Sequence, residues 1–94
     1  MTFGELIKNS RNYAGMPLRV AAKQIGISVG YLNDLEQGRA LRPKMKYIYA
    51  MAGLYGITID EICIKAGRVP QDVFYKIIQH PELMTVVRNY KKGE

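Results

Sequence analysis

The regular return of glycine between stretches of helical periodicity is the feature that most constrains this chain. A glycine readily adopts the left-handed conformation that ends a helix, so each of these glycines predicts a helix C-terminus. No stretch alternates apolar and polar residues over a useful length, and strands are therefore not favoured. The sequence predicts an all-α protein of short helices, which end at Gly15, Gly26, Gly38, Gly56 and near Gly67.

Capping residues and prolines mark where these helices begin. Thr2 and Glu5 have the spacing of a capping box, and so do Thr58 and Glu61. Ser28 is a suitable N-cap for the third helix. These signals predict helices over residues 2–14, 16–25, 28–38, 44–55 and 58–67, with further helical segments beginning at Pro70 and Pro81. We expect turns of about two to five residues between them.

Apolar residues recur on one face of each predicted helix, so the helices can share one core. Ala22 is small, and in a short helix it lets the next helix cross closely, as in a helix-turn-helix. Gly26 then supplies the turn, where a Cβ would be strained. The predicted inward residues are Phe3, Leu6, Ile7, Ala14, Ala21, Ala22, Ile25, Leu32, Leu35, Ile48, Met51, Ala52, Leu54, Tyr55, Ile59, Ile62 and Cys63.

Composition excludes several classes of protein. Hydrophobic residues make up 48% of the 94 residues, which suits one small domain with a core, with or without a short appendage. No apolar run is long enough for a membrane span, and the N-terminus does not resemble a signal peptide. The single cysteine, Cys63, is expected to be a buried thiol in a reducing cytoplasm. One histidine, one cysteine and no cluster of acids leave no candidate catalytic or metal site, so we expect neither an enzyme nor a cofactor.

The net charge of +6 favours a polyanionic partner. Arg39, Arg42, Lys44 and Lys46 follow the third predicted helix with no acid among them. These four residues form either a surface for nucleic acid or a solvated positive edge.

Residues 16–39, MPLRVAAKQIGISVGYLNDLEQGR, resemble the helix-turn-helix of the XRE family, which contains the Cro and repressor proteins of lambda-like phages. Residues 53–67, GLYGITIDEICIKAG, are similar to the connection between the family's fourth and fifth helices. The resemblance covers residues 2–67 and implies a five-helix, lambda-repressor-like DNA-binding domain over residues 1–67. It is carried in the motif by Ala22, Gly26, Ile27, Ser28, Leu32, Leu35, Glu36 and Gly38.

The resemblance also implies a structural salt bridge between Arg11 on the first helix and Glu36 at the end of the third. The residues themselves agree, because Glu36 lies one turn past Leu32 and therefore points inward. An inward carboxylate is costly without a partner, and arginine can bind it with two hydrogen bonds.

In this family the third helix lies in the major groove of DNA. Carried over position by position, Val29, Gly30, Asn33 and Asp34 would face the bases. Asn33 is the best candidate for readout, since a carboxamide can pair with adenine. Val29 and Gly30 replace the polar pair that is common here, which indicates either a close approach of the backbone to DNA or modest direct readout.

The resemblance places a second set of residues near phosphates. Leu18 departs from the family, which often has a phosphate-binding glutamine at this position, and a leucine side chain cannot make that bond. The cations after the third helix lie where the family grips the DNA backbone. The phosphate-contacting positions are Leu18, Ser28, Tyr31, Arg39, Arg42 and Lys44.

Residues 68–94 form a C-terminal helical extension outside this motif. Its apolar residues must cover something, and they either pack back on the first five helices or build a homodimer interface. His80 is expected to be a helix-end residue and not a ligand. The apolar residues are Val73, Phe74, Ile77 and Ile78, followed by Leu83, Met84, Val86, Val87 and Tyr90.

We therefore expect a transcriptional regulator, and specifically a repressor that binds an operator in double-stranded DNA as a homodimer. Repression is implied by the resemblance alone. The alternative is a protein-interaction module, antitoxin-like or regulator-binding, in which DNA binding is weak or secondary. Neither a membrane nor a small-molecule ligand is expected as a partner.

Overall fold

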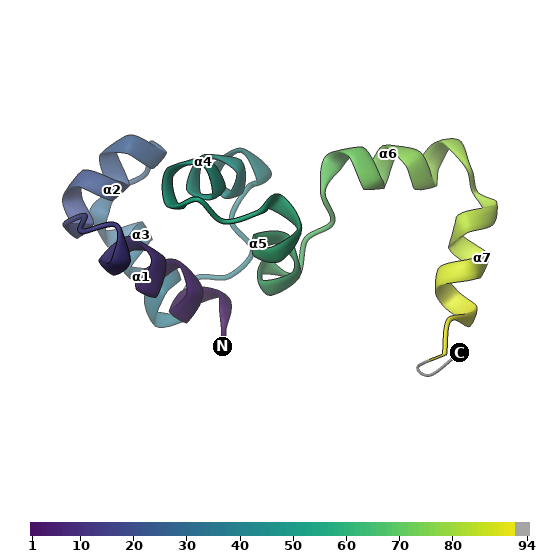
Figure 1. The fold of residues 1–94 in the computed structure, drawn as a ribbon, viewed down its shortest axis with the longest axis horizontal. Coiled ribbons are helices and arrows are strands. Elements are labelled where there is room, and N and C mark those ends of the chain that lie inside the picture. The colour runs from purple at the N-terminus through teal and green to yellow at the C-terminus, as the bar shows by residue number, and fades with distance from the viewer. Residues whose placement is uncertain (92–94) are drawn as a thin grey trace.

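The computed structural model describes residues 1–91, and within them the chain is all-helical (Figure 1). This confirms the predicted all-α class. The connection between α3 and α4 covers residues 38–44 and is longer than the predicted 39–43, because α3 ends at Gln37 and Lys44 is the N-cap of α4, which starts only at Met45. The helices are α1 (Phe3–Tyr13), α2 (Leu18–Ile25), α3 (Val29–Gln37), α4 (Met45–Tyr55), α5 (Ile59–Ala66), α6 (Gln71–Gln79) and α7 (Glu82–Asn89).

Side-chain caps hold the starts of three of these helices. Thr2 and Glu5 form a complete capping box at α1, with both bonds 3.1 Å long. The Ser28 hydroxyl accepts a bond from the Tyr31 N–H at 3.0 Å at the start of α3. At α5 only half of the predicted box is formed, in which Thr58 accepts from the Glu61 N–H at 3.2 Å. Each bond satisfies a backbone donor that the first turn of a helix would otherwise leave unpaired.

Helices α1 to α5 pack around one core, and we call them the five-helix body. Most predicted inward residues are buried, including Cys63, whose burial raises the pKa of its thiol. Ala14 was wrongly predicted to face inward: it is exposed, because α1 ends before it and the chain turns away at Gly15. Leu54, Tyr55 and Ile59 are only half-buried at the edge of the core. The largest fully buried side chains are Ile7, Leu32, Leu35, Ile48, Met51, Ile62, Pro43 and Cys63.

Gly4 allows α1 to approach the end of α3 very closely. A Cβ at this position would lie 2.5 Å from the carbonyl oxygen of Glu36 and 2.7 Å from that of Leu35. Real Cβ atoms do not come so close to backbone oxygens, so any larger residue would force the two helices apart. The position of α3 on the body therefore depends on a residue of α1.

Helices α6 and α7 form an arm that leads away from the five-helix body, with a sharp bend between them (Figure 1). The backbone N–H of Gln71 donates to the Tyr49 hydroxyl at 3.0 Å, which ties the start of the arm to α4. Neither arm helix has a buried residue. Of the two arrangements expected for the extension, packing back on the body is therefore not the one found. No helix in residues 1–91 is long and apolar enough to cross a membrane.

Candidate nucleic-acid interface

Helices α2 and α3 pack against each other across a tight turn. Gly26 has a φ of +93°, and its N–H and that of Ile27 both donate to the Ala22 carbonyl, at 2.9 and 3.0 Å. Ala22 itself is buried, so no larger side chain holds the two helices apart at this point. The geometry is that of a helix-turn-helix, in which the second helix is presented at the surface.

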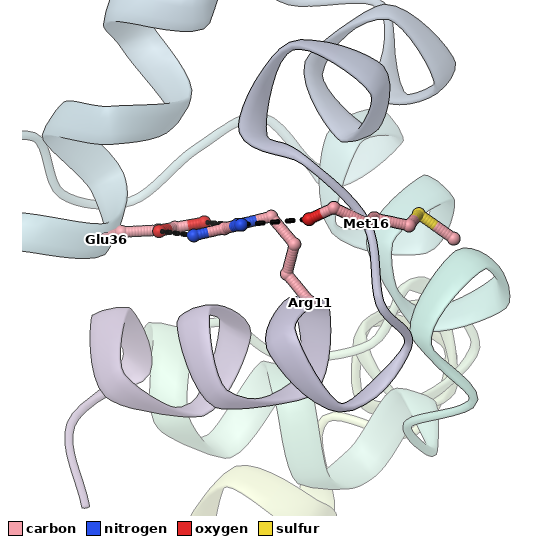
Figure 2. A network of polar contacts seen from close by, with 3 residues as sticks. All are labelled: Arg11, Met16 and Glu36. Atoms are coloured by element: carbon pink, nitrogen blue, oxygen red, sulfur yellow. Dashed lines mark hydrogen bonds and ion pairs between the residues drawn. The ribbon is translucent and has the colours of Figure 1, made fainter.

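Arg11 and Glu36 fix the inner face of α3 (Figure 2). The Nε of Arg11 donates to Oε2 of Glu36 at 2.7 Å, and Nη2 donates to Oε1 at 3.0 Å. The remaining side of the guanidinium donates through Nη1 to the Met16 carbonyl at 2.9 Å. The Glu36 side chain is only 1% exposed, and the hydrogen bonds to it raise the pKa of the Arg11 guanidinium. One side chain therefore joins α1, α3 and the segment before α2.

The outer face of α3 carries the residues that were predicted to meet bases. Val29 and Gly30 are exposed, and Asn33 and Asp34 are half-buried. A Cβ at Gly30 would meet nothing within 4 Å, so no side chain covers the backbone at this position. The Asn33 carboxamide can donate and accept hydrogen bonds with a base edge.

Asp34 and Arg39 bind each other across the end of this face. The Nε of Arg39 donates to Oδ1 of Asp34 at 2.9 Å, and both side chains are about half exposed. The predicted base contact and the predicted phosphate contact therefore neutralise one another in the free protein. The sequence did not predict this pairing, although a separation of five residues is within reach of a long arginine side chain.

The other predicted phosphate-contacting residues lie at the start of α2, at the start of α3 and in the 38–44 connection. Leu18 is half-buried against the core, so only its backbone is available to a phosphate. Tyr31 is half-buried and packs edge-to-face on Tyr47, with ring centroids 6.5 Å apart. Arg42 and Lys44 are exposed cations.

Arg68 was not predicted from the sequence as a functional residue, and it contacts this connection from just beyond the end of α5. Its Nη2 donates to the carbonyl oxygens of Arg42 and Pro43, both at 3.2 Å. The contact joins residues separated by 26 and 25 positions, and no local pattern in the sequence indicates it. Within residues 1–91 no group of three or more His, Cys, Asp or Glu side chains is placed to hold a metal ion.

Comparison with known families agrees with this geometry. A family model described as a helix-turn-helix domain matches residues 2–62, which cover most of the five-helix body. The chain belongs to the helix-turn-helix domain family. The matched residues include α2, the Gly26 turn and all of α3, but neither Arg68 nor the arm.

A helix-turn-helix relative gives the same result. The chain is 36% identical over 62 residues to the HTH-type transcriptional regulator DdrOP3 of Deinococcus deserti. The similarity covers 66% of this chain and 47% of that protein, so the match spans about half the length of the relative.

Proposed function

We propose that this helix-turn-helix protein is a sequence-specific, double-stranded DNA-binding transcriptional regulator. The observation that carries the proposal is the arrangement of α3: its inner face is fixed by the Arg11–Glu36 pair, its outer face is open, and cations follow it directly. The similarity to a transcriptional regulator supports the same function. In this proposal the protein acts in the cytoplasm.

In this proposal the N-terminal part of α3 enters the major groove. Asn33 pairs with adenine, and Val29 contacts a thymine methyl group. Gly30 leaves room for the backbone to approach the DNA, because no atom of the protein covers it. Asp34 lies on the same face, where its charge limits unspecific attraction to phosphate while it holds Arg39.

Phosphate contacts come from the surroundings of α3. Arg39, Arg42 and Lys44 supply charge, and Ser28 and Tyr31 supply hydroxyl groups at the start of α3. The backbone N–H groups near Leu18 face a phosphate at the N-terminus of α2. If each of two subunits neutralises about four phosphates, the logarithm of the affinity falls against that of the salt concentration with a slope of about −7.

The second part of the proposal is that residues 1–67 bind DNA and residues 68–94 form the interface of a homodimer. This dimer represses transcription by occupying an operator. The apolar side chains of the arm support this assignment, because Phe74, Ile78 and Val87 are each at least half exposed. Two copies related by a twofold axis would bind two half-sites about one DNA turn apart.

Titration of random-sequence duplex DNA at several salt concentrations tests the DNA-binding proposal. We expect salt-dependent binding, and we expect Arg42→Ala to weaken binding to all sequences and to reduce the slope by about 0.9 per subunit. Binding that does not depend on salt, or no binding, would contradict the proposal and favour a protein-interaction module.

Sedimentation equilibrium tests the dimer separately. Ile78→Glu places a charge on the apolar side of α6, and Gln79→Glu adds a negative charge to the neighbouring exposed position. We expect Ile78→Glu to be monomeric and Gln79→Glu to remain dimeric. An unaltered chain that is monomeric at micromolar concentration would contradict the assignment of the arm.

A further inference from the structure

The connection between α3 and α4 holds a strained residue at the place where we propose a phosphate contact. Arg42 has a φ of +55°, in the left-handed region that residues other than glycine seldom adopt. Such a conformation persists only where the surrounding structure fixes it. The next residue, Pro43, is fully buried and has no N–H with which to anchor the connection.

Arg68 supplies that anchor. In the part of the chain that the structure describes, the hydrogen bonds that reach the carbonyl oxygens of Arg42 and Pro43 come from Nη2 of Arg68, each 3.2 Å long. The backbone of Arg68 is held in turn, since its N–H donates to the Cys63 carbonyl at 2.9 Å at the end of α5. Cys63 is itself in the core, so the guanidinium extends from a rigid base.

The side chain of Arg68 is committed to this contact. It is half-buried, and its Nε is buried without a hydrogen-bond partner in the described residues. Leaving a charged donor unpaired is costly, and the two carbonyl bonds are what keeps the guanidinium in place. A cation whose only purpose was to attract DNA would instead remain in solvent.

We propose that Arg68 is a positioning residue for DNA binding, although it lies outside the matched residues 2–62. By holding the carbonyl oxygens of Arg42 and Pro43, it fixes the backbone from which the Arg42 guanidinium reaches a phosphate. This inference rests on the proposed function. It also gives Arg68, which leads into the arm, a role in shaping the DNA-binding surface without contacting DNA.

A double-mutant cycle on the full chain tests this role. Salt-dependent binding to duplex DNA is measured for the unaltered chain, Arg68→Ala, Arg42→Ala and the double variant. We expect Arg68→Ala to reduce the salt slope by about 0.9 per subunit, as Arg42→Ala does, and the double variant to bind like Arg42→Ala alone. Lys65→Ala removes an exposed cation from α5 and serves as the matched control, for which we expect little change.

Additive losses in the double variant would show that Arg68 contacts phosphate independently, and unchanged binding by Arg68→Ala would show that it is dispensable. Either result would overturn the assignment. If Arg68→Ala does not fold, Arg68→Met, which keeps a long side chain without any donor, takes its place in the same cycle.

NMR spectra recorded without DNA separate this inference from the proposed function. We expect the amide signals of Leu41 and Arg42 to lose their single ordered conformation in Arg68→Ala and to be unchanged in Lys65→Ala. Signals that remain ordered in Arg68→Ala would overturn the positioning role. A further outcome is that the unaltered chain fails to bind DNA while the Leu41 and Arg42 signals still become disordered in Arg68→Ala. That result would overturn the proposed function and leave Arg68 as an anchor of the connection between α3 and α4.

Discussion

Arg11 of α1 and Glu36 of α3 form a two-bond ion pair in which the carboxylate is almost completely buried. Removing the arginine would leave this carboxylate without its charged partner inside the body. The cost of breaking a buried pair is about 3 kcal/mol or more. We expect Arg11→Ala to lower the melting temperature by more than about 10 °C, measured by circular dichroism.

The exposed Arg19 on α2 provides the control for this experiment. Substitution of an exposed side chain usually changes stability by no more than about 0.5 kcal/mol, so Arg19→Ala should melt close to the unaltered chain. Equal melting temperatures for Arg11→Ala and Arg19→Ala would show that the pair does not stabilise the fold.

The close approach of α1 and α3 gives a second prediction. Gly4→Ala would place a Cβ 2.5 Å from a backbone oxygen of Glu36, and we expect the resulting shift to cost about 1–3 kcal/mol. Gly53→Ala is the matched control, because Gly53 lies within α4 and has no atom within 4 Å of the new Cβ. That variant should gain about 0.5–1 kcal/mol. Urea unfolding of both variants checks the opposite signs.

The helix ends could be predicted from the sequence because capping acts over only three or four residues. Thr2 with Glu5, and Gly26 before α3, are local signals of this kind. The Arg11–Glu36 pair could also be predicted, since the helical period places Glu36 inward and the family resemblance identifies Arg11 as its partner.

Contacts that depend on a non-helical backbone could not be predicted in this way. Arg68 reaches Arg42 across 26 residues, and the φ of Arg42 follows from tertiary packing and not from its residue type. The ion pair of Asp34 with Arg39 depends on how the chain turns at Gly38. Ala14 was placed on the helical stripe by its spacing, but α1 ends one residue before it.

The burial of Tyr55 should make the free energy of unfolding depend on pH. Its hydroxyl is buried without a hydrogen-bond partner in the described part of the chain, and burial raises the pKa of Tyr55 to about 12 from 10.0. The folded chain therefore holds the phenolic proton more tightly than the unfolded chain does. The linked stability is fully present below pH 10 and is lost as the pH rises through about 12.

We expect Tyr55→Phe to remove this loss, because phenylalanine has no proton to release. Near pH 7 the free energy of unfolding should be unchanged or higher by up to about 1 kcal/mol, since no hydrogen bond is broken. Denaturant unfolding at pH 7 and above pH 10 measures both effects. Parallel losses of stability in the two proteins above pH 10 would assign the pH dependence to other groups.

The ion pair between Asp34 and Arg39 indicates that Asp34 weakens DNA binding. Asp34→Asn would release Arg39 and remove a negative charge near phosphates. We expect tighter binding to all duplex sequences, because Arg39 no longer has to leave Asp34 in order to reach a phosphate and a repelling charge is gone. Asp72→Asn makes the same change of charge on the arm and should have little effect. Loss of preference at a single base pair in Asp34→Asn would instead identify Asp34 as a reader of cytosine.

Selection of bound sites from a random double-stranded DNA library tests whether α3 reads DNA in the major groove, with the unaltered chain and Asn33→Ala compared side by side. We expect a palindromic consensus with half-sites about one DNA turn apart, and loss of preference at one position of each half-site in Asn33→Ala. No enriched consensus, or a uniform loss of affinity in Asn33→Ala with the consensus unchanged, would contradict the placement of α3 in the major groove with Asn33 against the bases.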